Sequence, residues 1–129
     1  MRPILQGAKH SFIGGLRSTR GVAPASLRAG YEAQIDSTHT DPIRTGSLYG
    51  MCHIYKRLVE PDAWFTYEIE VRDDEWRGKV TRIKITVNGN ELFEYLDFAQ
   101  TFKEGHFAFQ QHDPGSKVCI RKIEVMEVK

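Results

Sequence analysis

The sequence predicts an all-β protein folded as an antiparallel two-sheet sandwich or jelly roll. Residues 64–72 and 80–87 alternate apolar and polar side chains with a period of two, as expected for strands that bury one face. Asn88 and Gly89 separate two alternating runs, which indicates a tight hairpin because both turn positions require a positive φ. From residue 30 onward no segment shows the 3.6-residue period of an amphipathic helix. Short, closely spaced strands of this kind favour a sandwich or jelly roll.

The elements follow one another along the whole chain. Residues 1–29 form an irregular N-terminal segment rich in glycine and arginine, with one short strand expected around 10–17. The later strands are expected, in chain order, over 31–36, within 41–55, and over 64–72, 80–87, 91–98, 106–112 and 117–128. Turn-forming residues separate them, including Pro42, Pro61, the polar run 73–79 and the Asp113-Pro114-Gly115 turn.

Composition excludes several classes of protein. The 129 residues suit a single domain, and a formal net charge of +1 gives no reason to expect nucleic-acid or anionic-membrane binding. No apolar run approaches the roughly 20 residues of a membrane-spanning helix, and the N-terminus lacks the apolar stretch of a signal peptide. Cys52 and Cys119 lie in expected strands, where we predict buried free thiols; one bridge between them, in an exported protein, is the alternative.

The strand after residue 30 has a strongly polar face. Residues 31–36 alternate between apolar and polar side chains, so one face carries Glu32, Gln34 and Asp36. A second polar row follows in 106–112, where Gln110 and His112 occupy alternate positions. Judged from the residues alone, rows of this kind are ordinary solvated surface. They become a candidate site if the fold brings both strands into one sheet.

The order of five motifs resembles that of the 3-keto-disaccharide hydrolase family, formerly catalogued as a domain of unknown function. The motifs are "GYEAQID", "RTGSLYG", "WFTYEIEV", "ITVNGNELFEY" and "GHFAFQQHDPGSKVCIRKIEV". The resemblance implies a concanavalin A-like jelly roll of the lectin and glucanase type over residues 30–129. Family members carry a longer part before the Gly-Tyr-Glu motif than the 29 residues found here, so it also implies that N-terminal strands of the fold are missing.

The family's substrates define the chemistry that the resemblance implies. They are glycosides oxidised to a ketone at the third ring carbon, and the ketone acidifies the neighbouring C–H bond. A base then forms an enolate, the aglycone leaves by β-elimination, and water adds back. This chemistry implies catalytic roles for Glu32 and His112, as a carboxylate base and an imidazole that titrates near neutral pH. Substrate-binding roles fall to Gln34, Asp36, Arg44, Tyr49 and Gln110.

Two other functions stay open at this point. A lectin-like module would hold a carbohydrate on the same face without turnover, and an incomplete fragment would have no activity of its own. The implied partner is a carbohydrate, with a homodimer covering the sheet edge that missing strands expose. We predict no cofactor and assign no metal: Glu32, Asp36, His112 and Asp113 suit divalent cations, which leaves a metal site as an alternative, but they form no dense ligand motif. Resembling proteins are often bacterial and periplasmic or secreted.

Overall fold

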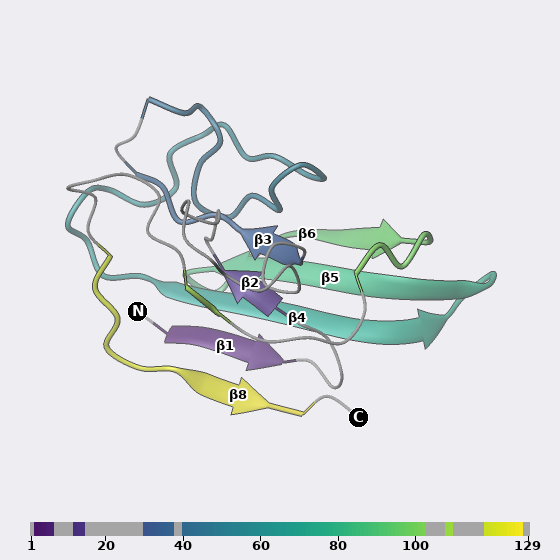
Figure 1. Ribbon diagram of the computed structural model, residues 1–129. Coiled ribbons are helices and arrows are strands. Elements are labelled where there is room, and N and C mark those ends of the chain that lie inside the picture. The colour runs from purple at the N-terminus through teal and green to yellow at the C-terminus, as the bar shows by residue number, and fades with distance from the viewer. Residues whose placement is uncertain are drawn as a thin grey trace, which may run out of the picture.

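The computed structural model describes residues 2–6, 12–14, 30–37, 40–102, 108–109 and 118–127. These residues form only strands, turns and loops, so the all-β prediction is confirmed (Figure 1). The strands, in chain order, are β1 (Arg2–Gln6), β2 (Phe12–Gly14), β3 (Tyr31–Ala33), β4 (Thr66–Glu75), β5 (Lys79–Val87), β6 (Asn90–Asp97), β7 (Ala108–Phe109) and β8 (Glu124–Met126). The described part of the chain holds no helix that is long and apolar enough to cross a membrane.

The strands form two sheets. The larger has the order β6-β5-β4-β1-β8, and the smaller has the order β3-β2-β7. β4, β5 and β6 are consecutive antiparallel strands, as the hairpin signals predict. β1 and β2 depart from this pattern, because β1 pairs in parallel with β4 and β8, and β2 pairs in parallel with β3 and β7. β2 lies in the 10–17 stretch where the sequence predicts a strand, whereas nothing in the sequence predicts β1.

The hairpin between β4 and β5 is tighter than the sequence predicts. β4 continues through the first three residues of the polar run 73–79, and the last residue of that run begins β5. The connection therefore consists of Trp76, Arg77 and Gly78 alone. Arg77 and Gly78 have φ values of 56° and 119°, in the left-handed region that allows the chain to reverse within three residues.

The hairpin between β5 and β6 has the predicted turn. Asn88 and Gly89 have φ values of 51° and 76°, so both central positions are left-handed, as a two-residue turn of this kind requires. Asn88 also ties the turn to the start of β4. Its backbone N–H donates to the Thr66 carbonyl at 3.0 Å, and its Oδ1 accepts from the Thr66 N–H at 3.0 Å.

The core lies between the two sheets. The apolar side chains that alternation predicts to face inward are at most 8% exposed: Phe65, Tyr67, Ile69, Val71, Ile83, Ile85 and Val87. Tyr31 and Ala33 of β3 are 1% and 0% exposed and belong to the same buried cluster. Full burial of a large apolar side chain contributes about 1.5–3 kcal/mol relative to exposure. This shared core therefore holds β3, and with it the smaller sheet, against β4 and β5.

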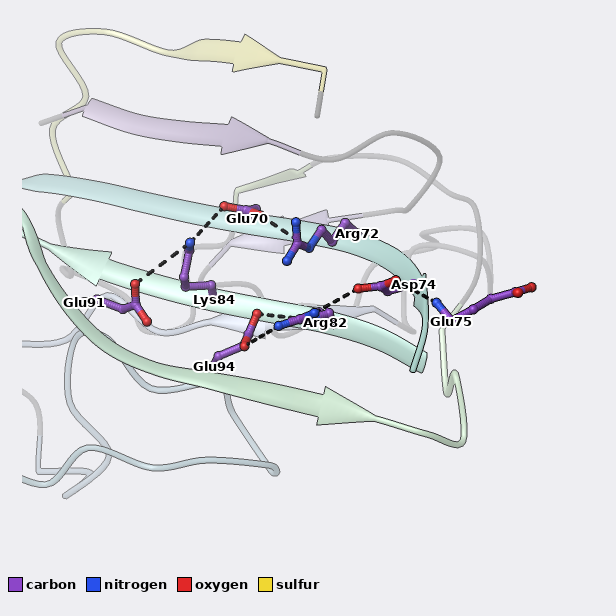
Figure 2. Close-up of polar contacts among 8 residues, drawn as sticks. All are labelled: Glu70, Arg72, Asp74, Glu75, Arg82, Lys84, Glu91 and Glu94. Atoms are coloured by element: carbon purple, nitrogen blue, oxygen red, sulfur yellow. Dashed lines mark hydrogen bonds and ion pairs between the residues drawn. The ribbon is translucent and has the colours of Figure 1, made fainter. Parts of the chain in front are cut away.

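The opposite face of β4, β5 and β6 is a layer of paired charges (Figure 2). Arg82 of β5 donates two hydrogen bonds of 2.9 and 2.8 Å to Glu94 of β6, and one of 2.8 Å to Asp74 of β4. Lys84 Nζ lies 3.2 Å from an oxygen of Glu70, its directly opposite partner on β4. The hydrogen bonds from Arg82 lower the pKa of the Glu94 carboxyl. These contacts satisfy the charges within the protein and favour the observed strand register.

The C-terminal segment differs from the prediction. Within the described residues, the strand predicted over 117–128 forms only as β8. Residues 118–123 run as an irregular exposed chain, so their apolar side chains have no buried face to occupy. Cys119 is consequently exposed and Cys52 is half-buried, and both thiols are free. The prediction of free thiols is confirmed, and the prediction that Cys119 is buried is wrong.

Candidate functional site

β3 continues beyond Ala33 as an extended chain, and the loop 43–49 folds back along it. An isolated antiparallel bridge links Ala33 to Leu48 in this loop. The predicted strand over 31–36 is thus a regular strand for three residues and an extended segment for three more. Four backbone N–H···O bonds join it to the loop: Tyr49 to Glu32 (2.8 Å), Gln34 to Ser47 (2.9 Å), Gly46 to Gln34 (3.2 Å) and Thr45 to Asp36 (3.0 Å).

Two glycines allow the loop to take this path. Gly46 and Gly50 have φ values of 97° and 77°, which other residues rarely adopt. Gly46 is also packed closely, since a β-carbon there would collide with the Leu92 side chain, while the space around Gly50 is open. The Thr-Gly-Ser-Leu-Tyr-Gly motif therefore encodes a fold-back that carries Tyr49 to the edge of β3.

Glu32 and Tyr49 lie opposite each other on the face that points away from the core. The bridged pair Ala33 and Leu48 is fully buried, at 0% exposure. Side chains alternate along extended chains, and directly opposite residues of an antiparallel pair share a face. Glu32 and Tyr49, one position away from the bridged pair on each segment, therefore both face outward, and each is half-buried. The structure brings together a carboxylate and a phenol ring that the sequence analysis selected.

Asp36 and Arg44 also come together, but through contacts within the protein. Arg44 Nη1 lies 3.4 Å from Asp36 Oδ1, and the Asp36 side chain is only 6% exposed. The Thr45 hydroxyl donates to the Asp36 carbonyl at 3.0 Å and accepts from the Asp36 N–H at 2.9 Å. Gln34 Nε2 reaches the Ile43 carbonyl at 3.4 Å. These side chains fasten the loop 43–49 to the extension of β3.

A buried hydrogen bond fixes the beginning of β3. Tyr31 Oη donates to Asp97 Oδ2 at 2.6 Å, and the same carboxylate accepts from the backbone N–H groups of Ala99 at 3.1 Å and Thr101 at 2.8 Å. Burial acts to raise the pKa of Asp97, but these hydrogen bonds stabilise the anion and leave the pKa below its usual value. Burial, followed by the hydrogen bond to Asp97, raises the pKa of the Tyr31 phenol. Glu32 therefore follows a residue that is anchored to β6.

The smaller sheet places β7 on the opposite side of β2 from β3. Ile13 of β2 pairs with Glu32 on one side and with Ala108 of β7 on the other. Neighbouring strands lie about 4.8 Å apart, so the backbones of β3 and β7 are separated by roughly 10 Å. Gln110 and His112, the second polar row in the sequence, lie outside the described residues.

His53 belongs to this region although the sequence analysis did not select it. Its ring lies beside that of Tyr49, with centroids 5.8 Å apart. Nε2 accepts the Gly50 N–H at 2.8 Å, and Nδ1 lies 3.3 Å from Tyr55 Oη. Because a backbone N–H can only donate, Nε2 is the acceptor of this bond, and Nδ1 is the ring nitrogen that faces the Tyr55 hydroxyl. The signal in the sequence is the spacing of Tyr49, His53 and Tyr55 around the glycine turn.

Within the described ranges, no group of three or more histidine, cysteine, aspartate or glutamate side chains is arranged to hold a metal ion. This part of the structure offers the carboxylate of Glu32, the phenols of Tyr49 and Tyr55, and the imidazole of His53, which lies next to both phenol rings. Groups of this kind can transfer protons and bind sugar hydroxyls.

These observations define a two-sheet, all-β domain in which β3 of the smaller sheet presents Glu32 on the face away from the core. Comparison with known families identifies it further, because the model of the 3-keto-alpha-glucoside-1,2-lyase-like domain matches residues 15–126. The chain belongs to this family, and the resemblance based on the order of motifs is confirmed. No curated protein and no solved structure matches the chain.

Proposed function

We propose that the domain cleaves 3-keto-glycosides, including 3-keto-disaccharides, by elimination followed by hydration. The description of the family as 1,2-lyase-like supports a reaction across the first and second ring carbons. The ketone at carbon 3 acidifies the hydrogen on carbon 2. A base removes this proton, the aglycone leaves carbon 1 with the bonding electrons, and a double bond forms between carbons 1 and 2. Water then adds to carbon 1 and a proton returns to carbon 2, which yields the free 3-keto sugar.

Glu32 is the proposed base. The observation that carries the proposal is the strand order β3-β2-β7, with Glu32 and Ala108 in register on either side of Ile13. His112, four positions after Ala108, is the proposed acid that protonates the leaving aglycone. Gln110, two positions after Ala108, is the proposed partner for sugar hydroxyls. In this proposal the base comes from β3 and the acid from the chain that follows β7, so that the two groups reach different atoms of a bound sugar.

The remaining candidate residues support this site. The backbone of Glu32 is fixed by β2 on one side and by the Tyr49 N–H on the other, so its carboxylate starts from a pre-organised position. In this proposal the Tyr49 ring contacts the sugar. Gln34, Asp36 and Arg44 contribute by holding the loop 43–49 in place. The two sheets are then the layers of a concanavalin A-like jelly roll, which is supported by the core that β3 shares with β4 and β5.

The test is turnover of a 3-keto-disaccharide in deuterium oxide, with a sample without protein to correct for spontaneous exchange. Wild type is compared with Glu32→Gln, His112→Ala and the control Glu91→Gln, which changes an exposed carboxylate on β6. We expect wild type and the control to release free sugar that carries deuterium on carbon 2. We expect each site variant to lose activity at least 100-fold, a typical contribution of general acid–base catalysis. Equal turnover in all four proteins would exclude this site, and unlabelled product would exclude elimination.

A non-catalytic, lectin-like module is the second candidate function. It is favoured by the ion pair between Asp36 and Arg44, which engages two of the predicted site residues in holding the fold rather than in acting on a substrate. Calorimetric titration with the same 3-keto-disaccharide separates the two candidates. Saturable binding by wild type without release of free sugar would support the lectin, and release of free sugar would exclude it.

A further inference from the structure

One end of the larger sheet carries two exposed aromatic rings that lie next to each other. Trp76, in the turn between β4 and β5, is 49% exposed, and Phe98, directly after β6, is 51% exposed. Their ring centroids are 6.3 Å apart and their planes differ by 33°. Figure 1 shows the β4–β5 turn and the chain after β6 at the same end of the sheet. Single exposed apolar side chains are normal, whereas an adjacent pair of large rings indicates a contact surface.

The backbone holds both rings in place. Arg77, next to Trp76, has a φ of 56°, which is uncommon for a residue other than glycine and persists where the surrounding structure enforces it. Here the pairing of Glu75 with Lys79 closes the hairpin directly below the turn. Phe98 follows Asp97, the residue that binds the Tyr31 hydroxyl. Both rings therefore project from fixed points at the sheet's end, and little conformational freedom would be lost when they bind a ligand.

The other tryptophan has a different environment. Trp64 is 46% exposed, but the guanidinium of Arg121 lies 3.8 Å from the centre of its ring. This cation–π contact ties the segment before β4 to the segment before β8, so the position of Trp64 is explained within the fold. The guanidinium over Trp76 comes from the adjacent residue, Arg77, at 5.0 Å. This contact joins two adjacent residues and does not tie distant segments together, as the contact at Trp64 does. The fold therefore does not explain why Trp76 and Phe98 are exposed.

The charges around the two rings indicate the class of ligand. The acidic residues near the two rings, Asp73, Asp74, Glu75, Glu94 and Asp97, are at least as many as the basic residues, Arg72, Arg77, Lys79 and Arg82. This end of the sheet therefore has no excess of positive charge to attract a polyanion or an anionic membrane. A neutral ligand with an apolar face and a polar rim suits such a surface. Sugars have this character, because their C–H groups stack on the negative faces of aromatic rings and their hydroxyls bind polar side chains.

We propose that Trp76 and Phe98 form a saccharide-binding platform, separate from the face that carries Glu32. The choice of a saccharide over another neutral ligand rests on the proposed function. The platform takes unoxidised sugar units, since stacking on a ring needs no ketone. It serves to hold an oligosaccharide or glycan beside the domain while the Glu32 face acts on, or binds, an oxidised unit.

The chain has two tryptophans, so each can be observed alone by its fluorescence. Trp64→Phe leaves Trp76 as the reporter, and Trp76→Phe leaves Trp64. Each protein is titrated with cellohexaose, maltohexaose and laminarihexaose. We expect a saturable change in emission for Trp64→Phe with at least one hexasaccharide, and none for Trp76→Phe. Adding Phe98→Ala to Trp64→Phe is expected to weaken that binding at least tenfold, or about 1.4 kcal/mol.

The outcomes separate this platform from the proposed function. Trp76→Ala is expected to cleave a 3-keto-disaccharide as fast as wild type. A response of Trp76 in a protein that cleaves nothing would support the platform and count against the enzyme. No response to any hexasaccharide by Trp64→Phe protein that is folded by circular dichroism would overturn the platform, as would an equal response from Trp64. Self-association that is lost in Trp76→Ala, without a saccharide response, would assign the rings to a protein contact and also overturn the platform.

Discussion

Removing the Tyr31 hydroxyl tests whether the anchor at the start of β3 stabilises the fold. In Tyr31→Phe the ring keeps its place in the core, but Asp97 loses its shortest hydrogen bond, of 2.6 Å. The carboxylate is 5% exposed, so water cannot readily replace the missing donor. Hydrogen bonds to charged groups typically contribute about 1.5–3 kcal/mol. We therefore expect the free energy of unfolding to fall by about 2 kcal/mol at pH 7, which corresponds to roughly 6–10 °C in Tm for a domain of this size.

The loss should depend on pH in a defined direction. The hydrogen bonds lower the pKa of Asp97 in the folded protein below that of the unfolded chain, which is about 3.9 for aspartate. A lowered carboxyl pKa contributes stability that is present above the unfolded pKa and is lost as the pH falls through the folded pKa. The difference in unfolding free energy between wild type and Tyr31→Phe should therefore be constant near neutral pH and shrink below about pH 4.

Urea unfolding of the two proteins at pH 7 and at several values below pH 4 measures both effects. Tyr55→Phe is the matched control, because that phenol is 65% exposed and its change should alter stability by less than about 0.5 kcal/mol. A loss in Tyr31→Phe no larger than in Tyr55→Phe would refute the assignment of the bond as stabilising. A loss that grows toward low pH would refute the sign of the linkage.

Two further predictions concern the loop 43–49 and the thiols. Gly46→Ala and Gly50→Ala both place a side chain at a positive φ, but only the new β-carbon at position 46 would collide with Leu92. The free energy of unfolding in urea should therefore fall by at least about 1 kcal/mol more in Gly46→Ala than in Gly50→Ala. Equal losses would mean that the core adapts freely. Cys119 is exposed, whereas Cys52 is half-buried and its pKa is raised by burial. A thiol reagent should therefore modify Cys119 first in native protein. Faster modification of Cys52 would contradict this burial.

Local sequence patterns predicted the elements whose partners are close in the chain. The alternation of residues 64–72 and 80–87 identified the buried faces of β4 and β5, and Asn88 and Gly89 identified the turn after them. β1 escaped prediction because its five residues show no clear alternation and its partners come from distant segments. The sequence also did not predict the exposure of Cys119. An alternating run forms a strand with one buried face only where a neighbouring strand and a core are present.

The sequence predicts which residues the candidate site contains better than it predicts how their side chains are arranged. Alternation placed Glu32 on the outward face of β3, and the structure has it there. The same alternation put Asp36 on that face, but regular pairing ends at Ala33, and the loop 43–49 then covers the Asp36 carboxylate. The ion pair between Asp36 and Arg44 depends on the fold-back of the loop at its glycine turn. Alternation with a period of two describes extended strands and does not predict the geometry of such a turn. His53 was missed for the same reason, because its contacts are made across the turn at Gly50.

The position of β1 between β4 and β8 has a consequence for the order in which the sheet assembles. Ile4 pairs with Glu68 and Glu124, which lie 64 and 120 positions later in the chain, whereas β4, β5 and β6 are joined by two short turns. Closing long loops costs chain entropy, and contacts between distant residues slow folding. The three-stranded meander should therefore form first, β1 should dock on its edge, and β8 should join last. The amides of β8 would then be the last of the larger sheet to gain protection from hydrogen exchange during refolding.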